Sequence, residues 1–510
     1  LESLRLLKVD VLALGMLTAI RKTLALADGR RGTRLGMADI LARGDDPAVY
    51  KMICAADTMG VFQIESRAQM SMLPRLRPRC FYDLVVEVAI VRPGPIQGDM
   101  VHPYLRRRAE RTPPDYPTPA IRKVLERTLG VPIFQEQVME LAIEAAGFSP
   151  GEADQLRRSM AAWKRKGGLQ PYEQRLKEGM AARGYAPQFA ERLYRQILGF
   201  GEYGFPESHA ASFALLAYVS AWLKHHEPAA FLAGLLNSQP MGFYAPAQLI
   251  QDARRHGVEV RPVDVCFSHP QSVLEDGAVR LGLGQIMGLG KAAAQAVAQA
   301  RAAAPFVSVA DLAQRAALDR GDLGRLAAAG ALHTLAGHRR QAWWEAAGIE
   351  TRPGLLQHAP VAEAAPVLAP PGEAQDMVAD YRSLGFTLGR HPLALLRPRL
   401  EKMGYLQAAQ LQDCPGNRRV RLAGLVVGRQ RPGTASGTIF VTLEDESGHG
   451  NVIVWPDLAD RQRAELLCAR LMGVEGVLER EGQVLHLIAR RLRDHSAWLR
   501  QLPTRSRDFH

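Results

Sequence analysis

The first 240 residues carry apolar positions at helical spacing, and glycine and proline punctuate them as helix stops. The pattern predicts helices in the regions 11–27, 121–130, 152–168 and 208–226. By contrast, the apolar runs in LLKVDVLALGM (6–16) and at the start of VEVAIVRPGPIQGDMV (86–101) predict short strands.

The pattern changes twice in the second half of the chain. Residues 245–340 are alanine-rich and predict short helices, whereas residues 351–375 are rich in proline and alanine and predict a linker. Between residues 418 and 492, five short segments alternate apolar and polar positions with glycine at the turns. Five such strands favour a small β-barrel of the OB-fold type.

Composition adds a basic, multidomain character. The chain has 510 residues, 64 Lys and Arg against 52 Asp and Glu, and a pI of about 9.6, so we expect several domains and a polyanionic partner. Residues 100–200 hold 17 Lys and Arg and 11 Asp and Glu. Their net charge of +6 is half of the excess of +12 for the whole chain. The longest apolar stretch, 210–223, is too short to span a bilayer.

The cysteines and the first residues indicate the compartment and the extent of the chain. Five cysteines stand far apart without a CxxC pair, which favours reduced thiols over disulfides or zinc and predicts a cytoplasmic protein. The first ten residues, LESLRLLKVD, contain neither an initiator methionine nor a signal-peptide core, and we expect the chain to begin partway through a longer one.

One carboxylate and one lysine stand together near the start. Lys8 and Asp10 are two residues apart in a strand-like run, and period-2 geometry places them on one face. The pair is interpreted either as a solvated surface pair or as a Mg²⁺ ligand beside a phosphate-binding lysine.

Basic residues gather at two places in the first half. Arg106, Arg107 and their neighbour Arg108 follow a Gly-Pro turn, and they are either a solvated run or a contact with backbone phosphates. The helix predicted over 152–168 carries a stripe that suits a triphosphate or a nucleic-acid backbone, with a generic basic helix as the alternative. The stripe consists of Arg157, Arg158, Lys164, Arg165 and Lys166.

A glycine-rich turn lies between two short helical patterns. In Ile286-Met-Gly-Leu-Gly-Lys291, Gly288 and Gly290 let the backbone approach a phosphate, and Lys291 opens the next helix. The arrangement resembles a helix-hairpin-helix, which contacts the DNA backbone rather than base sequence. An ordinary helical turn is the alternative.

Taken in order, these segments resemble the C-family of bacterial DNA polymerases, the catalytic α-subunit type. The resemblance covers nearly the whole chain, and AAWKRKGG with the final SRDFH is similar to the error-prone, ImuC-like branch. The motifs that carry it are LLKVDVLALGM, GVFQIESR, VAIVRPGPIQGDMV, PIFQEQVM, EADQLRRSM, GFGEYGFPESHAASFALLAYVSAWLK, the hairpin and the terminal strands.

The resemblance implies a fold and a division into domains. The fold is multidomain and mainly α-helical with a C-terminal β-barrel. The implied regions are the end of a palm (1–30), helical fingers (31–245), a helix-hairpin-helix region (246–350), a linker (351–375), a connecting helical segment (376–417), an OB-fold (418–492) and a basic tail (493–510).

The resemblance also implies roles for individual residues. Asp10 matches the last of three palm aspartates that hold two catalytic Mg²⁺ ions, and Lys8 matches a lysine near the incoming nucleotide. Arg157 and Arg158 match arginines that bind its triphosphate. The reaction is the attack of a primer 3′-hydroxyl on the α-phosphate of a dNTP, on primer–template DNA.

The OB-fold is expected to contact single-stranded template through basic and aromatic side chains. The basic candidates are Arg419, Arg421 and Arg429. The aromatic candidates are Phe440 and Trp455, which are interpreted equally well as part of the barrel core.

Two departures from the family shape the expectation. The PDxDxDF-like motif with the other two aspartates does not occur in these 510 residues, so we expect a C-terminal fragment that is inactive alone. The interval APVLAPPGEAQDMVADYRSLGF lacks a clear clamp-binding peptide, so we expect the sliding clamp to be reached only indirectly, through an ImuB-like accessory protein.

Two alternatives stay open. One is a fragment of a replicative DNA polymerase III α subunit. The other is a non-enzymatic DNA-binding module. No membrane partner is expected.

Overall fold

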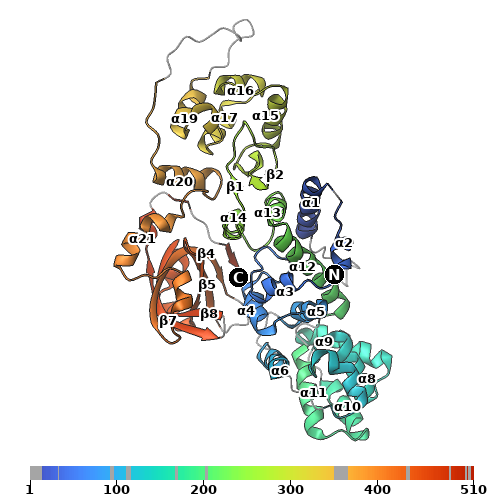
Figure 1. Ribbon diagram of the computed structural model, residues 1–510. Helices are drawn as coiled ribbons and strands as arrows, with labels where there is room; N and C mark the ends of the chain where they lie inside the picture. Colours follow the sequence, from blue (N-terminus) through green and yellow to red (C-terminus); the bar gives the residue numbers. More distant parts are fainter. Residues whose placement is uncertain are drawn as a thin grey trace.

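A mainly helical body leads into a β-barrel, which confirms the predicted fold class (Figure 1). The computed structural model describes residues 14–509 apart from 33, 92–96, 111–115, 167–169, 201–204, 350–365, 432–436, 482–483, 500–501 and 504–506. The helices between residues 135 and 200 form one end of the molecule, those between residues 291 and 347 form the opposite end, and the barrel lies beside the middle (Figure 1).

The helical body is built from the elements before residue 256. They are α1 (Leu14–Arg31), α2 (Met37–Ala42), α3 (Pro47–Cys54), α4 (Arg67–Leu76), α5 (Phe81–Ile90), α6 (Gln97–Glu110), α7 (Pro119–Leu125), α8 (Gln135–Ala146), α9 (Pro150–Lys166), α10 (Gln170–Ala182), α11 (Pro187–Phe200), α12 (Glu207–His226), α13 (Pro228–Leu236) and α14 (Pro246–Arg255). Helices were predicted at α1, α7, α9 and α12, and all four are confirmed.

Helix α12 forms the centre of this body, because its apolar side chains are buried on nearly every side. Trp222 is 2% exposed, and the helix packs against α5, α13 and α3. The strand predicted at residues 86–91 is wrong, since Val86–Ile90 is the end of α5. Every residue from Asp83 to Ile90 is buried, so the apolar positions of α5 are not confined to one face, and they form no amphipathic period that would identify a helix.

Within the described residues, no helix combines the length and the apolar character needed to cross a membrane.

The region from residue 257 to 383 combines short helices with a small sheet that the alanine-rich pattern did not predict. Strand β3 (Ala278–Arg280) pairs in parallel with β1 (Val260–Arg261) and antiparallel with β2 (Val273–Glu275). The helices are α15 (Lys291–Ala303), α16 (Val309–Arg315), α17 (Arg320–Ala328), α18 (His333–Ala336), α19 (Arg339–Ala347) and α20 (Glu373–Ser383). Helix α20 includes the last three residues of the predicted linker, and residues 351–365 of that linker lie outside the described residues.

The barrel closes on itself after α21 (Pro392–Lys402). Strand β4 (Arg419–Gln430) pairs with β5 (Ile439–Glu444), and β5 pairs with β6 (His449–Val454). Strand β6 pairs in parallel with β8 (Val484–Asp494), β8 pairs with β7 (Leu471–Glu481), and β7 pairs again with β4. This order, with α22 (Pro456–Arg461) and α23 (Arg463–Cys468) between β6 and β7, is that of an OB-fold.

Close approach of strands inside the barrel depends on glycine. A Cβ on Gly476 would lie 2.2 Å from the carbonyl oxygen of Ile488, at a bulge between β7 and β8. Within the predicted basic tail, β9 (Arg507–Phe509) adds to the barrel by pairing in parallel with β4.

Candidate nucleotide and DNA interface

Two neighbouring arginines on α9 share one carboxylate. Arg157 donates to Asp154 Oδ1 from Nε (3.0 Å) and Nη2 (2.8 Å), and Arg158 Nε lies 2.8 Å from Asp154 Oδ2. The hydrogen bond from Arg157 holds the pKa of Asp154 below its ordinary value, with the charge of Arg158 adding to the effect. The side chain of Arg158 is 73% exposed, so an anionic ligand can reach the pair.

Few other residues of the predicted basic stripe can be placed. Lys164, Arg165 and Lys166 belong to the last turn of α9, but their side chains lie outside the described residues. On α6, Arg106 is exposed. Arg107 instead donates from Nη1 to the carbonyl oxygen of Leu129 at 2.5 Å, and burial lowers its pKa.

The third arginine of the α6 cluster has a structural role. Arg108 makes two hydrogen bonds to Asp83, Nη1 to Oδ1 at 2.7 Å and Nη2 to Oδ2 at 2.6 Å, and it also caps the carbonyl oxygens of Leu76 and Arg77. The guanidinium therefore joins α6 to the end of α4 and the start of α5. Only Arg106 keeps the exposed character expected of a phosphate contact.

The glycine turn adopts a hairpin before α15. Gly288 has φ of +80°, a conformation that favours glycine, and a Cβ there would lie 3.2 Å from Arg325 Nε. Gly290 is the N-cap of α15, and the exposed Lys291 is its first residue. A helix N-terminus with an adjacent lysine and arginine suits a backbone phosphate.

The charge of Lys291 acts on a lysine of α1. Burial lowers the pKa of Lys22, and the charges of Arg21 and Lys291 lower it further. Lys22 also donates to the carbonyl oxygen of Asn237, at the end of α13. Asp10 and Lys8 lie outside the described residues, a few positions before α1 begins.

The barrel candidates divide into exposed and buried side chains. Arg419 and Arg421 are exposed on β4, where Arg421 Nε lies 3.3 Å from Glu475 Oε2. Arg429 is 8% exposed and donates to the carbonyl oxygens of Leu466 (2.7 Å) and Ala469 (2.5 Å). Arg429 therefore stabilises the barrel, contrary to its expected contact with the template.

The two aromatic candidates also differ. Trp455 is 50% exposed at the start of α22, whereas Phe440 on β5 is partly buried. The half-exposed indole is available for stacking, and the Phe440 ring is less so.

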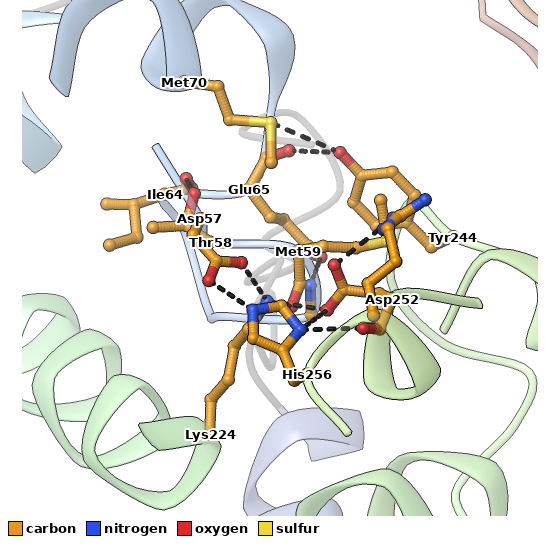
Figure 2. Close-up of polar contacts among 12 residues, drawn as sticks. Asp57, Thr58, Met59, Ile64, Glu65, Met70, Lys224, Tyr244, Asp252 and His256 are labelled. Atoms are coloured by element: carbon orange, nitrogen blue, oxygen red, sulfur yellow. Dashed lines mark hydrogen bonds and ion pairs between the residues drawn. The ribbon is translucent and has the colours of Figure 1, made fainter. Parts of the chain in front are cut away.

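One cluster of acids was not predicted from the sequence. Asp57, Asp252 and His256 place one ligand atom each within 4.8 Å of one another (Figure 2). Lys224 reaches into this group, with Nζ 2.9 Å from Asp57 Oδ1 and 2.8 Å from Asp252 Oδ2. The ammonium already neutralises the carboxylates, so the cluster is a structural ion-pair network and does not fit a metal centre.

The predicted sites lie at separate positions along the molecule. Helix α9 and the hairpin before α15 lie toward opposite ends, with the barrel beside the middle (Figure 1). Residues so far apart cannot all contact one small ligand. They suit an extended polyanion that several positive surfaces contact along its length.

Two family models match parts of the chain. The bacterial DNA polymerase III alpha subunit finger domain matches residues 16–184, which include α9. The helix-hairpin-helix motif matches residues 257–342, which include Gly288, Gly290 and Lys291.

Curated proteins match over the full length of the chain. An error-prone DNA polymerase of Azoarcus sp. (strain BH72) is 64% identical over 529 residues, covering 100% of this chain and 49% of that protein. Proteins of the same name from Alkalilimnicola ehrlichii and Methylococcus capsulatus are 64% and 59% identical, with 50% and 51% of their lengths covered. The chain spans about half the length of the curated relatives it matches.

Proposed function

We propose that the chain is part of an error-prone DNA polymerase, because residues 16–184 match the finger domain of the bacterial DNA polymerase III alpha subunit, residues 257–342 match the helix-hairpin-helix motif, and curated error-prone DNA polymerases are similar to the whole chain. The observation that carries this proposal is the exposed Arg157–Asp154–Arg158 group within the matched finger domain. Two adjacent guanidiniums offer paired donors for the oxygens of a triphosphate.

The proposed reaction is template-directed nucleotidyl transfer. Arg157 and Arg158 bind the triphosphate of the incoming dNTP, and Lys8 adds a positive charge near it. Asp10 is the proposed ligand of Mg²⁺, and two Mg²⁺ ions supply stabilisation of the attacking and leaving oxygens when bound. The hairpin at Gly288, Gly290 and Lys291 holds the backbone of primer–template DNA.

A site for two Mg²⁺ ions needs more carboxylates than the matched motifs of these 510 residues contain. Asp10 is the one aspartate that matches the palm set, and the described Asp57–Asp252–His256 cluster is filled by Lys224. We therefore propose that a polypeptide of these residues alone binds DNA without extending a primer. Primer extension by that polypeptide with Mg²⁺ and dNTPs, lost in an Asp10→Ala variant, would contradict this.

The names of the relatives support the error-prone branch. We propose a role in translesion synthesis in the cytoplasm, with recruitment by an ImuB-like accessory protein and indirect contact with the sliding clamp. The test is pull-down of each purified partner by the chain. Tight binding of the clamp to residues 340–420 would contradict the indirect arrangement.

The function itself is tested with the longer polymerase that contains this chain. Extension of a primer past a template lesion is expected, and substitution of both arginines, R157Q with R158Q, is expected to raise the KM for dNTPs at least tenfold. An unchanged KM would show that these arginines do not bind the triphosphate. DNA binding without any synthesis would favour a non-enzymatic DNA-binding module.

A further inference from the structure

An open hollow lies between the helical body and the barrel. On the body side its lining comes from the start of α4 and from residues 243–248, and on the barrel side from β4, β5 and β6. The residues that matter below are Arg67, Gln248, Gln430, Thr442 and His449.

Arg67 brings a positive charge into this hollow without a direct partner. It is the first residue of α4 and is partly exposed, and its burial lowers its pKa while the charges of Tyr244 and Glu444 offset part of that effect. Among the described residues, no hydrogen bond or ion pair to the Arg67 side chain is found. A partly desolvated guanidinium is stabilised when an anion pairs with it.

The nearest buried acid is already satisfied by other groups. Glu444 is 2% exposed, and its carboxylate lies 3.4 Å from His391 Nε2, 3.3 Å from His449 Nε2 and 3.1 Å from Gln248 Nε2. Although burial raises its pKa, the hydrogen bond from His449 and the nearby imidazole of His391 hold the pKa of Glu444 below its ordinary value. Glu444 therefore does not need Arg67, and Arg67 remains available for a ligand.

The other acid at the hollow is also engaged. Glu65 is 7% exposed, and its Oε2 accepts a hydrogen bond from the backbone N–H of Gly60 at 3.1 Å. Tyr244 donates from its hydroxyl to the carbonyl oxygen of Glu65 at 2.9 Å, which fixes the body side of the hollow (Figure 2).

The surroundings favour a phosphate as the missing anion. Helix α4 begins here, so its N-terminal partial charge adds to that of Arg67. Thr442 and Gln430 contribute a hydroxyl and an amide from the barrel. Strands β5 and β6 are the second and third strands of the OB-fold, the face that binds oligonucleotides in this fold.

We propose that the hollow is a binding site for one backbone phosphate of single-stranded nucleic acid, with Arg67 as its anchor between the body and the barrel. This inference rests on the proposed function and extends it. It adds Arg67 as a nucleic-acid contact separate from Arg157, Arg158 and the hairpin. Occupation of the site would tie the barrel to the body whenever a strand passes between them.

The experiment compares Arg67→Gln with Arg79→Gln in the full chain. Arg79 is an exposed arginine on the same part of the body, two residues before α5. We expect R67Q to bind a fluorescent oligo-dT about tenfold more weakly, with a salt dependence lower by about 0.7, the share of one phosphate contact on a single strand. R79Q and binding of duplex DNA through the hairpin are expected to stay unchanged.

Thermal unfolding without ligand separates a binding role from a structural one. Since R67Q removes an unpaired, partly desolvated charge, its unfolding temperature is expected to equal or exceed that of the parent chain. A lower unfolding temperature with unchanged oligo-dT affinity would show Arg67 to be a partner of Glu444 and would overturn the proposal. R67K, which keeps the charge but not the fork, is expected to lie between the two.

Free phosphate compounds distinguish the source of the anion. Inorganic phosphate, pyrophosphate and dTTP are each added to oligo-dT binding assays. Competition at millimolar concentration that R67Q abolishes supports a phosphate site. If dTTP competed with oligo-dT but R67Q bound oligo-dT as tightly as the parent chain, the phosphate at this site would not come from single-stranded nucleic acid. If the parent chain bound neither single-stranded nor duplex DNA, the proposed function itself would fail, whereas equal affinities of R67Q and R79Q for oligo-dT would refute this inference alone.

Discussion

Arg157 Nη2 lies 2.8 Å from Asp154 Oδ1, and the carboxylate of Asp154 also holds Arg158. The three side chains are partly or largely exposed on α9, so the ion pairs are open to competition by an anion. A triphosphate bound by both arginines, as proposed above, would compete with Asp154 for their donors.

Asp154→Asn is therefore expected to lower the KM for dNTPs in the longer polymerase by about two- to fivefold, because exposed ion pairs contribute about 0.2–1 kcal/mol each. Steady-state primer extension measures it. Arg157→Gln serves as the opposite control, with a raised KM. If both substitutions raised the KM equally, Asp154 would instead orient the arginines for the nucleotide.

The hairpin gives a second prediction. Lys291→Gln is expected to weaken binding of primer–template DNA about three- to tenfold at low salt and to reduce the salt slope by about 0.9, the share of one duplex phosphate. The matched control is Lys123→Gln, on the exposed side of α7. Equal slopes for the two variants, measured by anisotropy at four salt concentrations, would remove Lys291 from the interface.

How far the sequence predicted the structure depends on the range of the interactions. Barrel strands such as His449–Val454 were predictable because buried and partly exposed positions alternate along them. Helix α5 was not, because a helix buried on all sides has the same apolar run as a buried strand. The three-stranded sheet before α15 rests on strands of two or three residues, too short for any period.

Side-chain contacts between residues far apart in sequence were the features that could least be predicted. Arg108 belongs to a basic run in sequence, but its partner Asp83 is 25 residues away and decides its role. Lys224 donates to the carbonyl oxygen of Met59, 165 residues upstream. Local spacing holds no information about such pairs, and they were found only once the helices were packed.

Lys224 supports a prediction about stability. Its side chain is 6% exposed and neutralises Asp57 and Asp252, so Lys224→Met leaves two carboxylates close together without their cation. We expect a loss of about 3–5 kcal/mol in the free energy of unfolding, measured by urea denaturation. The control is Lys51→Met on the exposed side of α3, expected to change it by less than about 0.5 kcal/mol. A small effect of K224M would mean that water or His256 replaces the ammonium.

Glu87 supports the opposite prediction, a substitution that stabilises. It is fully buried on α5, and burial raises its pKa to about 8. Among the described residues, neither of its carboxylate oxygens has a hydrogen-bond partner. The folded state therefore keeps Glu87 protonated, while the unfolded state releases its proton above about pH 4.3.

The sign follows from this difference in bound protons. Between about pH 4.3 and pH 8 the folded state holds more protons than the unfolded state, so stability falls as pH rises, by up to about 5 kcal/mol. Glu87→Gln removes the titration, and we expect it to unfold at a higher temperature than the parent chain at pH 8 but at a similar one at pH 4.5. Glu110→Gln, on the exposed end of α6, controls for charge. Destabilisation by E87Q at pH 8 would show that the carboxylate is ionised and bound to a cation in the folded state.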